Sequence, residues 1–281
     1  MQIGARLFEG PGPFLMGVVN VTPDSFSDGG RFADADAAAA QARRLGEEGA
    51  DLVDLGGEST RPGAPPVPVA EELRRVIPVI ERLRAGGFAL PISVDTSKPE
   101  VARAALDAGA DLVNDVQGLA APELAALVAA RGVPVVLMHM RGTPADMTSR
   151  AVYADVVEDV AAELEQALAR AERAGVRRDR VVLDPGVGFA KTAEQSLALL
   201  AGLGRLRRLG CPLLVGPSRK SFIGKLTGAE VADRLPGTLA AVAACVLAGA
   251  ELVRVHDVAA ARQAARVAAA IREAARAGSA P

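Results

Sequence analysis

The chain has 281 residues, of which 50% are hydrophobic and 23% are charged, so it can bury a large core beneath a polar surface. Its formal net charge of -2 and its 3% aromatic content offer neither a basic field nor stacking surfaces, so we expect no nucleic-acid partner. No apolar run reaches the roughly 18 residues of a membrane span, and residues 1–13 lack a secretory pattern, so we expect no membrane partner and a cytoplasmic location.

Short runs rich in Val, Ile and Leu alternate along the chain with longer stretches of helical spacing. This alternation is typical of βα units around a parallel sheet. The expected strands are 14–21, 51–57, 91–97, 111–116, 133–140, 181–188, 212–218 and 251–258. Eight such strands close a TIM barrel, and no linker divides the chain, so we predict an α/β fold with a single (β/α)8 barrel domain over residues 1–281.

The stretches between the strands predict helices, several of which end at a glycine that can cap them. The expected helices are 34–49, 69–85, 99–109, 122–131, 151–174, 193–208, 233–248 and 259–277. Two connections, 22–34 and 58–68, are long and rich in turn residues, which is typical of binding loops. The two cysteines, Cys211 and Cys245, sit in apolar runs and are expected to be free buried thiols.

Polar side chains gather where the expected strands end. A barrel builds its site at this edge, and leaving such groups buried without partners costs ~1–3 kcal/mol each. A ligand is the natural partner. The residues are Asn20, Asp95, Asn114, Asp115, Asp184, Lys220, Arg254 and His256.

Eight motifs at these strand ends resemble, in order, those of the dihydropteroate synthase family. They are MGVVNVTPDSFSDGG (16–30), GGESTRPGA (56–64), SVDTSK (93–98), NDVQG (114–118), LMHMRGTP (137–144), DPGVGF (184–189), SRKSFIG (218–224) and RVHDV (254–258). The resemblance implies a transferase of folate biosynthesis. Its reaction joins a pterin methyl diphosphate to 4-aminobenzoate and releases pyrophosphate.

By this resemblance, four residues would recognise the pterin. Asp184 matches the carboxylate that accepts paired N–H groups of the ring, and Asn114 matches the residue that reads another ring edge. Asp95 lies near the reacting side, and Met138 would line the pocket. The alternatives are that Asp95 and Asn114 only cap strand ends, and that Met138 is an ordinary core residue.

The resemblance also assigns the diphosphate. Arg254 and His256, two residues apart on one strand face, would bind the leaving group, and Asn20 matches a residue that contacts Mg²⁺. With one weak protein ligand, Mg²⁺ would keep several waters and bind the diphosphate itself. We therefore expect Mg²⁺ as the cofactor.

For 4-aminobenzoate, the resemblance implies contacts from two loops and one helix start. Lys220 would face it from the pterin side, and Ser221 would hold its carboxylate. The loop residues Thr60, Arg61 and Pro62, with Phe189, would surround the aromatic ring; the alternative for Arg61 is a solvated surface charge. The family also implies a homodimer.

His139 stands in an apolar run, and we interpret it as a satisfied buried histidine outside the site. The segment after Phe189 departs from the family pattern. Ala190 stands where glycine is expected, and Ser196 where the second residue of a His/Gln-Asn pair is expected. These departures bear on the local loop and not on the reaction.

Two other functions stay open on the sequence alone. One is a methyltetrahydrofolate methyltransferase, which shares a pterin-binding barrel but needs no diphosphate or aminobenzoate site. The other is a pterin-binding subunit without activity. Residues 56–64 and 218–224 disfavour the first, and the intact set of polar residues at the strand ends disfavours the second.

Overall fold

The computed structural model of the chain describes residues 1–10, 12–22 and 30–277, except the side chains of 30–34. Its centre is a sheet of eight parallel strands in the order β8-β7-β6-β5-β4-β3-β10-β9. A parallel bridge between Leu183 and Leu213 joins the two ends of this order, so the sheet closes into a barrel. The strands are β3 (Phe14–Asn20), β4 (Leu52–Gly56), β5 (Ile92–Asp95), β6 (Leu112–Asp115), β7 (Val135–Met138), β8 (Val181–Asp184), β9 (Leu214–Val215) and β10 (Leu252–Val255). The predicted (β/α)8 barrel is confirmed.

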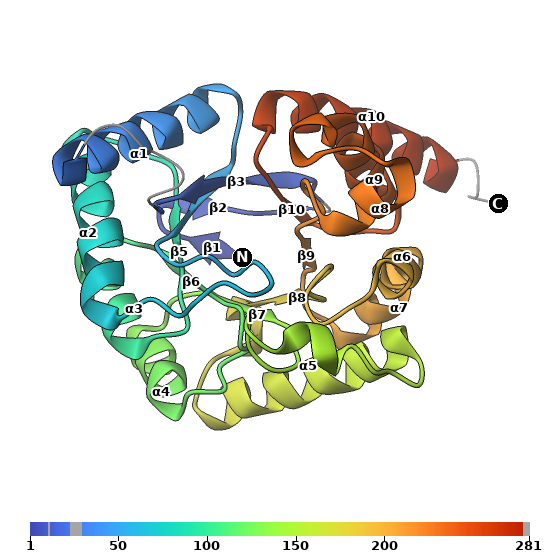
Figure 1. Cartoon of the computed structure of the whole chain (residues 1–281), viewed down its shortest axis with the longest axis horizontal. Coiled ribbons are helices and arrows are strands. Elements are labelled where there is room, and N and C mark those ends of the chain that lie inside the picture. Colours follow the sequence, from blue (N-terminus) through green and yellow to red (C-terminus); the bar gives the residue numbers. More distant parts are fainter. Residues whose placement is uncertain (11, 23–29, 278–281) are drawn as a thin grey trace.

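Helices follow the strands and form a ring outside the barrel (Figure 1). They are α1 (Gly30–Glu47), α2 (Val69–Ala85), α3 (Pro99–Asp107), α4 (Pro122–Arg131), α5 (Val156–Arg173), α6 (Ala193–Ala201), α7 (Leu203–Leu206), α8 (Ser221–Thr227), α9 (Leu235–Leu247) and α10 (Val258–Ala277). The bounds predicted for α2 and α4 agree with the structure.

The structure departs from the prediction most clearly in three places. The expected loop 22–34 ends early, because α1 begins at Gly30; residues 23–29 of that loop lie outside the described residues. The expected helix 193–208 breaks at Gly202, where a β-carbon would lie 2.6 Å from a methyl carbon of Val157. The short helix α8 was not among the expected helices.

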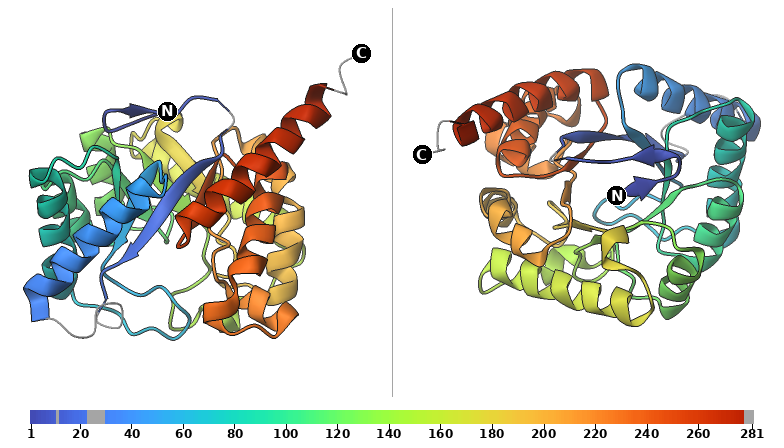
Figure 2. Two further views of the ribbon diagram at one scale, coloured as in Figure 1. Left: turned by 90° about the horizontal axis from the view of Figure 1, so that it is seen from above. Right: turned by 180° about the vertical axis from the view of Figure 1, so that it is seen from behind.

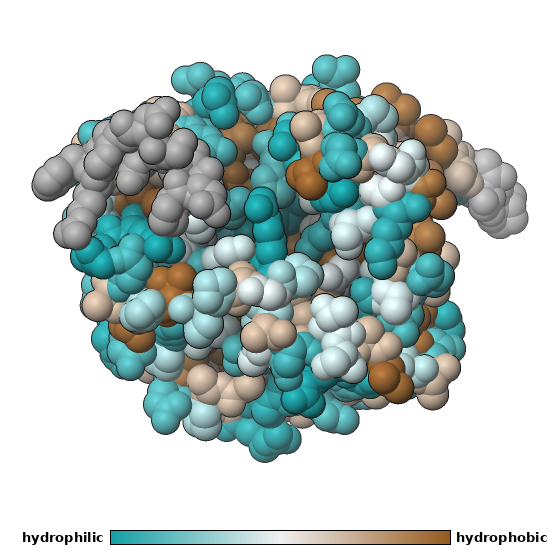
Figure 3. Space-filling model, in the orientation of Figure 1, coloured by the Kyte–Doolittle hydropathy of each residue, from teal (hydrophilic) through white to brown (hydrophobic). Residues whose placement is uncertain are grey.

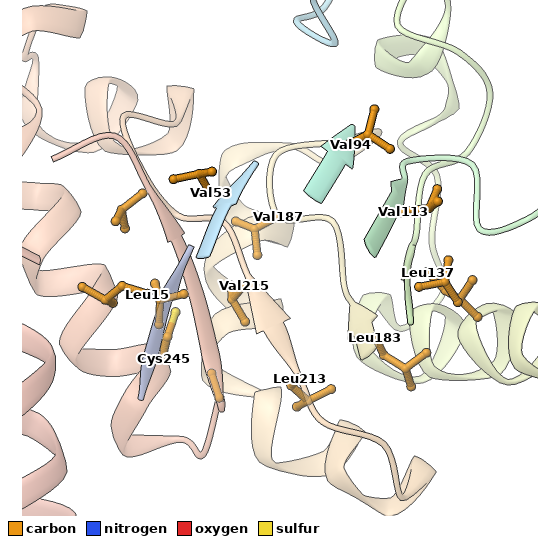
Figure 4. Close-up of a cluster of buried hydrophobic side chains, with 14 of the residues drawn as sticks. Leu15, Val53, Val94, Val113, Leu137, Leu183, Val187, Leu213, Val215 and Cys245 are labelled. Carbon is orange, nitrogen blue, oxygen red and sulfur yellow. The ribbon is translucent and has the colours of Figure 1, made fainter. Parts of the chain in front are cut away.

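The strands alternate between two apolar environments, as their period of two requires. One set of residues packs with the helices and includes Leu15, Val53, Val94, Val113, Leu137 and Leu183 (Figure 4). The other set fills the barrel interior and includes Met16, Leu52, Leu112, Val136, Val182, Leu214 and Leu252. Strands buried on both sides explain why the sequence reads as continuous apolar runs.

A hairpin of β1 (Gln2–Ile3) and β2 (Arg6–Leu7) covers the end of the barrel where the strands begin (Figure 2, right). Ile3, 1% exposed, and Phe8 belong to the same apolar cluster as the interior strand residues. The ring of Phe8 meets that of Phe14 edge-on at 4.9 Å. The hairpin therefore completes the core at this end, and the opposite end is left for the site.

Both cysteines are free and buried, as predicted. Among the described helices, none has the length and apolar content that a membrane crossing requires.

Candidate active site

The inward side chains change from apolar to polar toward the carboxyl ends of the strands. On four strands a polar residue comes two residues after the apolar interior one: Leu52 precedes Asp54, Leu112 precedes Asn114, Val182 precedes Asp184 and Leu252 precedes Arg254. This polar layer lies at the face seen in Figure 1. The space-filling view of the same face is hollowed near its centre, with hydrophilic side chains around the hollow (Figure 3).

Arg254 connects the carboxylates of two neighbouring strands. Its Nε donates to Oδ2 of Asp54 at 2.6 Å, and its Nη2 donates to Oδ2 of Asp95 at 2.9 Å. Asn114 Nδ2 donates to the same Asp54 oxygen at 3.1 Å. Three predicted site residues, Asp95, Asn114 and Arg254, are thus brought together, and Asp54 is the group that joins them.

Asp54 was missing from the predicted site. It is fully buried, and its Oδ1 has no hydrogen-bond partner among the described residues. The signal was present in the sequence, since Asp54 is the acidic residue within the apolar run 52–55. A carboxylate in such a position must face a cation or a ligand, because an isolated buried charge is very unfavourable.

The Asp95 carboxyl group holds its proton at neutral pH. Burial and, after it, the nearby Asp54 carboxylate together raise the pKa of Asp95 to about 8, against the opposing effect of Arg254. A protonated Asp95 adds no negative charge of its own beside the Arg254–Asp54 ion pair.

Asp184 ends β8 beside Met138 of β7, its partner in the strand register. Gly186 N donates to Asp184 Oδ1 at 2.7 Å. Burial raises the pKa of Asp184 to about 6, against the lowering effects of that hydrogen bond and of Lys220 and Arg254. At neutral pH Asp184 is therefore an anion at the base of the site. Met138 is 5% exposed.

Lys220 lies over the ring of Phe189, with Nζ 3.8 Å from the ring centroid. Burial lowers the pKa of Lys220 to about 8, an effect that Asp184 opposes and Arg254 reinforces. Lys220 is also the residue before α8, whose first residue is the exposed Ser221. Because α8 has only seven residues, its dipole offers little help in holding an anion.

His256, two residues after Arg254, is held from the β9–α8 connection. Ser218 Oγ lies 2.9 Å from His256 Nδ1 and accepts a hydrogen bond from His256 N at 3.2 Å. Burial and, after it, the cations of Arg254 and Arg219 together lower the pKa of His256 to about 4. The ring is therefore uncharged at neutral pH.

A second buried cluster supports the connection between β8 and α6, and its key residue, Lys191, was also missing from the predicted site. Lys191 Nζ lies 2.9 Å from His139 Nδ1 and donates to the carbonyl oxygens of Gly186 and Phe189 at 3.0 Å each. His139 Nε2 in turn bonds Glu163 at 2.9 Å. His139 is thus a satisfied buried side chain, in agreement with its interpretation from the sequence.

The two departures from the family pattern fall in and beside this connection. Ala190 has a φ of 48°, in the left-handed region that favours glycine, and its carbonyl oxygen accepts a hydrogen bond from Tyr153 OH at 2.9 Å. The Ser196 hydroxyl is buried within α6 and donates to Thr192 O at 2.7 Å. Both residues face the protein and not the polar layer.

The loop 58–68 carries Thr60, Arg61 and Pro62, of which the last two are exposed. No hydrogen bond or ion pair among the described residues joins these three to the polar layer. The loop is fixed at its base, where Lys98 pairs with Glu58 and with the fully buried Glu72. Gly63 N donates to Pro144 O at 2.8 Å, so the loop tip reaches the connection after β7.

Asn20 ends β3, is half-buried and pairs in register with Gly56. Its amide oxygen is a ligand type that suits a hard cation such as Mg²⁺. Within residues 1–10, 12–22 and 35–277, no group of three or more His, Cys, Asp or Glu side chains is arranged to hold a metal ion.

Comparison with known proteins agrees with the motifs. A family model described as pterin binding enzyme matches residues 16–256. A dihydropteroate synthase from Synechocystis sp. is 47% identical over 95% of this chain and 93% of its own length.

Solved structures are equally similar over nearly the whole chain. A Xanthomonas albilineans dihydropteroate synthase with 4-aminobenzoic acid is 52% identical, with a TM-score of 0.87 over 96% of this chain and 94% of that one. The same organism's enzyme in complex with 7,8-dihydropteroate is 49% identical, with a TM-score of 0.84 over 96% and 95%. The family inferred from the motifs is confirmed: the chain belongs to the pterin-binding enzymes, and among them to the dihydropteroate synthases.

Proposed function

We propose that this chain is a transferase that condenses 6-hydroxymethyl-7,8-dihydropterin diphosphate with 4-aminobenzoate, giving 7,8-dihydropteroate and pyrophosphate. The observation that carries the proposal is the polar layer at the carboxyl ends of the strands, where Asp95, Asn114, Asp184, Lys220 and Arg254 meet. Similarity to enzymes solved with 4-aminobenzoic acid and with 7,8-dihydropteroate supports it.

In this proposal the pterin binds in the polar layer. Asp184, anionic near neutral pH, accepts a pair of N–H bonds from the ring. Asn114 both donates and accepts at another edge, Met138 lines the pocket, and protonated Asp95 can donate a hydrogen bond as well as accept one. A protonated carboxyl group next to the reacting side of the ring adds no negative charge that would oppose departure of the diphosphate.

The reaction breaks the bond between the methylene carbon and the diphosphate oxygen, and the electron pair leaves with the oxygen. The amine nitrogen of 4-aminobenzoate then forms the C–N bond and loses one proton. Arg254 and His256 bind the leaving group, and such preorganised donors are typically worth about 3–4 kcal/mol each in the transition state. Asn20 would hold Mg²⁺, which would supply positive charge to the diphosphate.

We place 4-aminobenzoate between Lys220 and the loop 58–68. Phe189, already in contact with Lys220, would pack near the aromatic ring. Ser221 would hold the carboxylate, and Thr60, Arg61 and Pro62 would approach from the loop.

The test is pyrophosphate release measured with purified protein, Mg²⁺ and both substrates. We expect release only when pterin diphosphate and 4-aminobenzoate are present together, with 7,8-dihydropteroate formed in equal amount. Methyl transfer from methyltetrahydrofolate, or pterin binding without any turnover, would contradict the proposal and favour one of the two alternative functions.

We further propose that the chain forms a homodimer in a reducing, cytoplasmic setting. Exposed apolar side chains gather on the outer helices α9 and α10: Leu247, Val267 and Ile271 are 46%, 61% and 54% exposed. Such a patch supports a contact between two copies of the chain. The two free, buried thiols are compatible with a reducing compartment.

A further inference from the structure

Ser218 was not among the predicted site residues, yet it contacts an active-site histidine at two atoms. Its side chain is buried, at 7% exposure, in the connection between β9 and α8. Its Oγ lies 3.2 Å from His256 N and 2.9 Å from His256 Nδ1. The directions of these two hydrogen bonds determine where the imidazole carries its proton.

The backbone contact can run in one direction only. His256 N–H must donate, so Ser218 Oγ is the acceptor there. The hydroxyl has a single proton of its own, and the described residues offer it no acceptor other than His256 Nδ1. All three groups are satisfied together only when Ser218 O–H donates to an unprotonated Nδ1, which leaves the ring proton on Nε2.

The charges around the ring keep it neutral. Arg254 on its own strand, with Arg219 and Lys220 from the β9–α8 connection, disfavours a second proton. Asp257 is the neighbouring anion, but it is paired with Arg219 through bonds of 2.6 and 3.0 Å. Burial acts in the same direction as the three cations and lowers the pKa of the ring to about 4.

Ser218 is itself held in place by the residue that follows it. Arg219 adopts a φ of 56°, and its N–H donates to Thr238 Oγ1 at 2.9 Å. Its guanidinium bonds Asp257, which follows His256 directly, so the connection is attached to the end of β10. The position of the hydroxyl is therefore fixed before any ligand arrives.

We infer that Ser218 is a positioning residue that locks His256 in the Nε2–H tautomer, so that the neutral ring presents one N–H donor. Among the described residues no hydrogen bond occupies Nε2, which leaves this donor for a ligand. That the ligand is the departing diphosphate rests on the proposed function. The tautomer itself does not.

The chain contains only two histidines, so ¹⁵N labelling of histidine gives a readable spectrum. A His256→Gln variant assigns the signals by their loss. In the ligand-free wild-type protein we expect His256 Nδ1 to behave as an unprotonated, hydrogen-bonded nitrogen and Nε2 as a protonated one. A ring protonated at Nδ1 would overturn the inference.

Two substitutions separate positioning from packing. Ser218→Ala removes the donor that stabilises the neutral ring, so the titration midpoint of His256 should rise toward its ordinary value, and the nitrogen shifts should move toward a mixture of tautomers. Ser218→Thr keeps the hydroxyl and should restore the wild-type spectrum. Ser196→Ala removes another buried hydroxyl and should leave the His256 signals unchanged.

Turnover provides the second measurement. For Ser218→Ala we expect kcat to fall about tenfold, as for loss of a partner that orients an active-site histidine, with pterin affinity unchanged and the threonine variant within twofold of wild type. An unchanged His256 titration, or wild-type turnover in the alanine variant, would refute the role of Ser218. Failure of the wild-type protein to release pyrophosphate would instead count against the proposed function, because the spectra are recorded without substrates.

Discussion

Asp184 shows how burial prepares a side chain for a ligand. The carboxyl group of Asp184 is 6% exposed, and its pKa is raised to about 6. It is therefore ionised at neutral pH and becomes protonated as the pH falls through about 6. An ionised carboxylate accepts two N–H bonds from a pterin, whereas a protonated one must present its own hydrogen to one of them. Ligand affinity should therefore follow the protonation of this residue.

We predict that pterin affinity is constant between about pH 6.5 and 7.5 and weakens toward tenfold per pH unit below pH 6, because each binding event then requires loss of a proton. Calorimetric titration between pH 5 and 7.5 measures this, in a range where Asp95 stays protonated and Lys220 stays charged. Asp184→Asn should bind ~2–3 kcal/mol more weakly and with no pH dependence from this site. Wild-type affinity that stays flat down to pH 5 would remove Asp184 from pterin binding.

The residues that the sequence did not assign share a physical cause. Asp54 and Lys191 lie inside expected elements or beside a recognised motif, but their importance depends on which way each side chain points. For Asp54, the inward direction follows from the register that pairs it with Val18 and Ser93. For Lys191, it follows from a loop that folds its own carbonyl groups around Nζ. The partners of Asp54 lie far away in the sequence. Those of Lys191 are close in sequence, but only the fold of the loop turns their carbonyl groups toward Nζ.

The bounds of an element were predicted correctly where its hydrophobic spacing alone determines them. They were predicted wrongly where packing against a distant residue determines them. The helix α2 shows the spacing of an amphipathic helix, with Val76, Ile80 and Leu83 buried, and its predicted bounds were correct. By contrast, the break after α6 depends on Val157 of α5, which packs where a side chain at position 202 would stand. The hairpin β1–β2 is too short for its strands to be recognised from alternation.

The loop 58–68 is held at its base and by one hydrogen bond from Gly63, and two of its predicted aminobenzoate contacts, Arg61 and Pro62, are exposed. Ordering loop residues costs ~1–2 kcal/mol each, more than a small arylamine alone can supply. We therefore predict that 4-aminobenzoate binds the free protein poorly. It should bind at least tenfold more tightly once Mg²⁺, pyrophosphate and a pterin have bound.

Calorimetric titration of 4-aminobenzoate in the presence and absence of those three ligands tests this order. Arg61→Ala is the matched variant, since Arg61 is exposed and should matter only in the complex. Equal affinity in both states would mean that the second site exists beforehand and that loop ordering has no part in it.

At the scale of the whole molecule, the proposed dimer rests on the outer surface of α9 and α10, where Leu247, Val267 and Ile271 are exposed. We predict that Ile271→Glu raises the dimer dissociation constant at least about a hundredfold, because a charge would have to be buried at the contact. Sedimentation measures the change. Val152→Glu, at an apolar residue elsewhere that is 74% exposed against 54% for Ile271, should leave the assembly intact. A wild-type chain that sediments as a monomer would contradict the dimer.

The hairpin that covers the beginning of the barrel strands bears on how substrates enter the site and how the product leaves it. Among the described residues, Ile3 and Phe8 pack into that end, so the polar layer faces solvent at the carboxyl ends of the strands. With the pterin in the polar layer, as proposed, and 4-aminobenzoate nearer the loop 58–68, the pterin half would enter first and leave last. A product molecule that dissociates slowly from the site would exclude the next pterin diphosphate. The product 7,8-dihydropteroate would therefore inhibit the enzyme by competing directly with the pterin diphosphate, without any separate regulatory site.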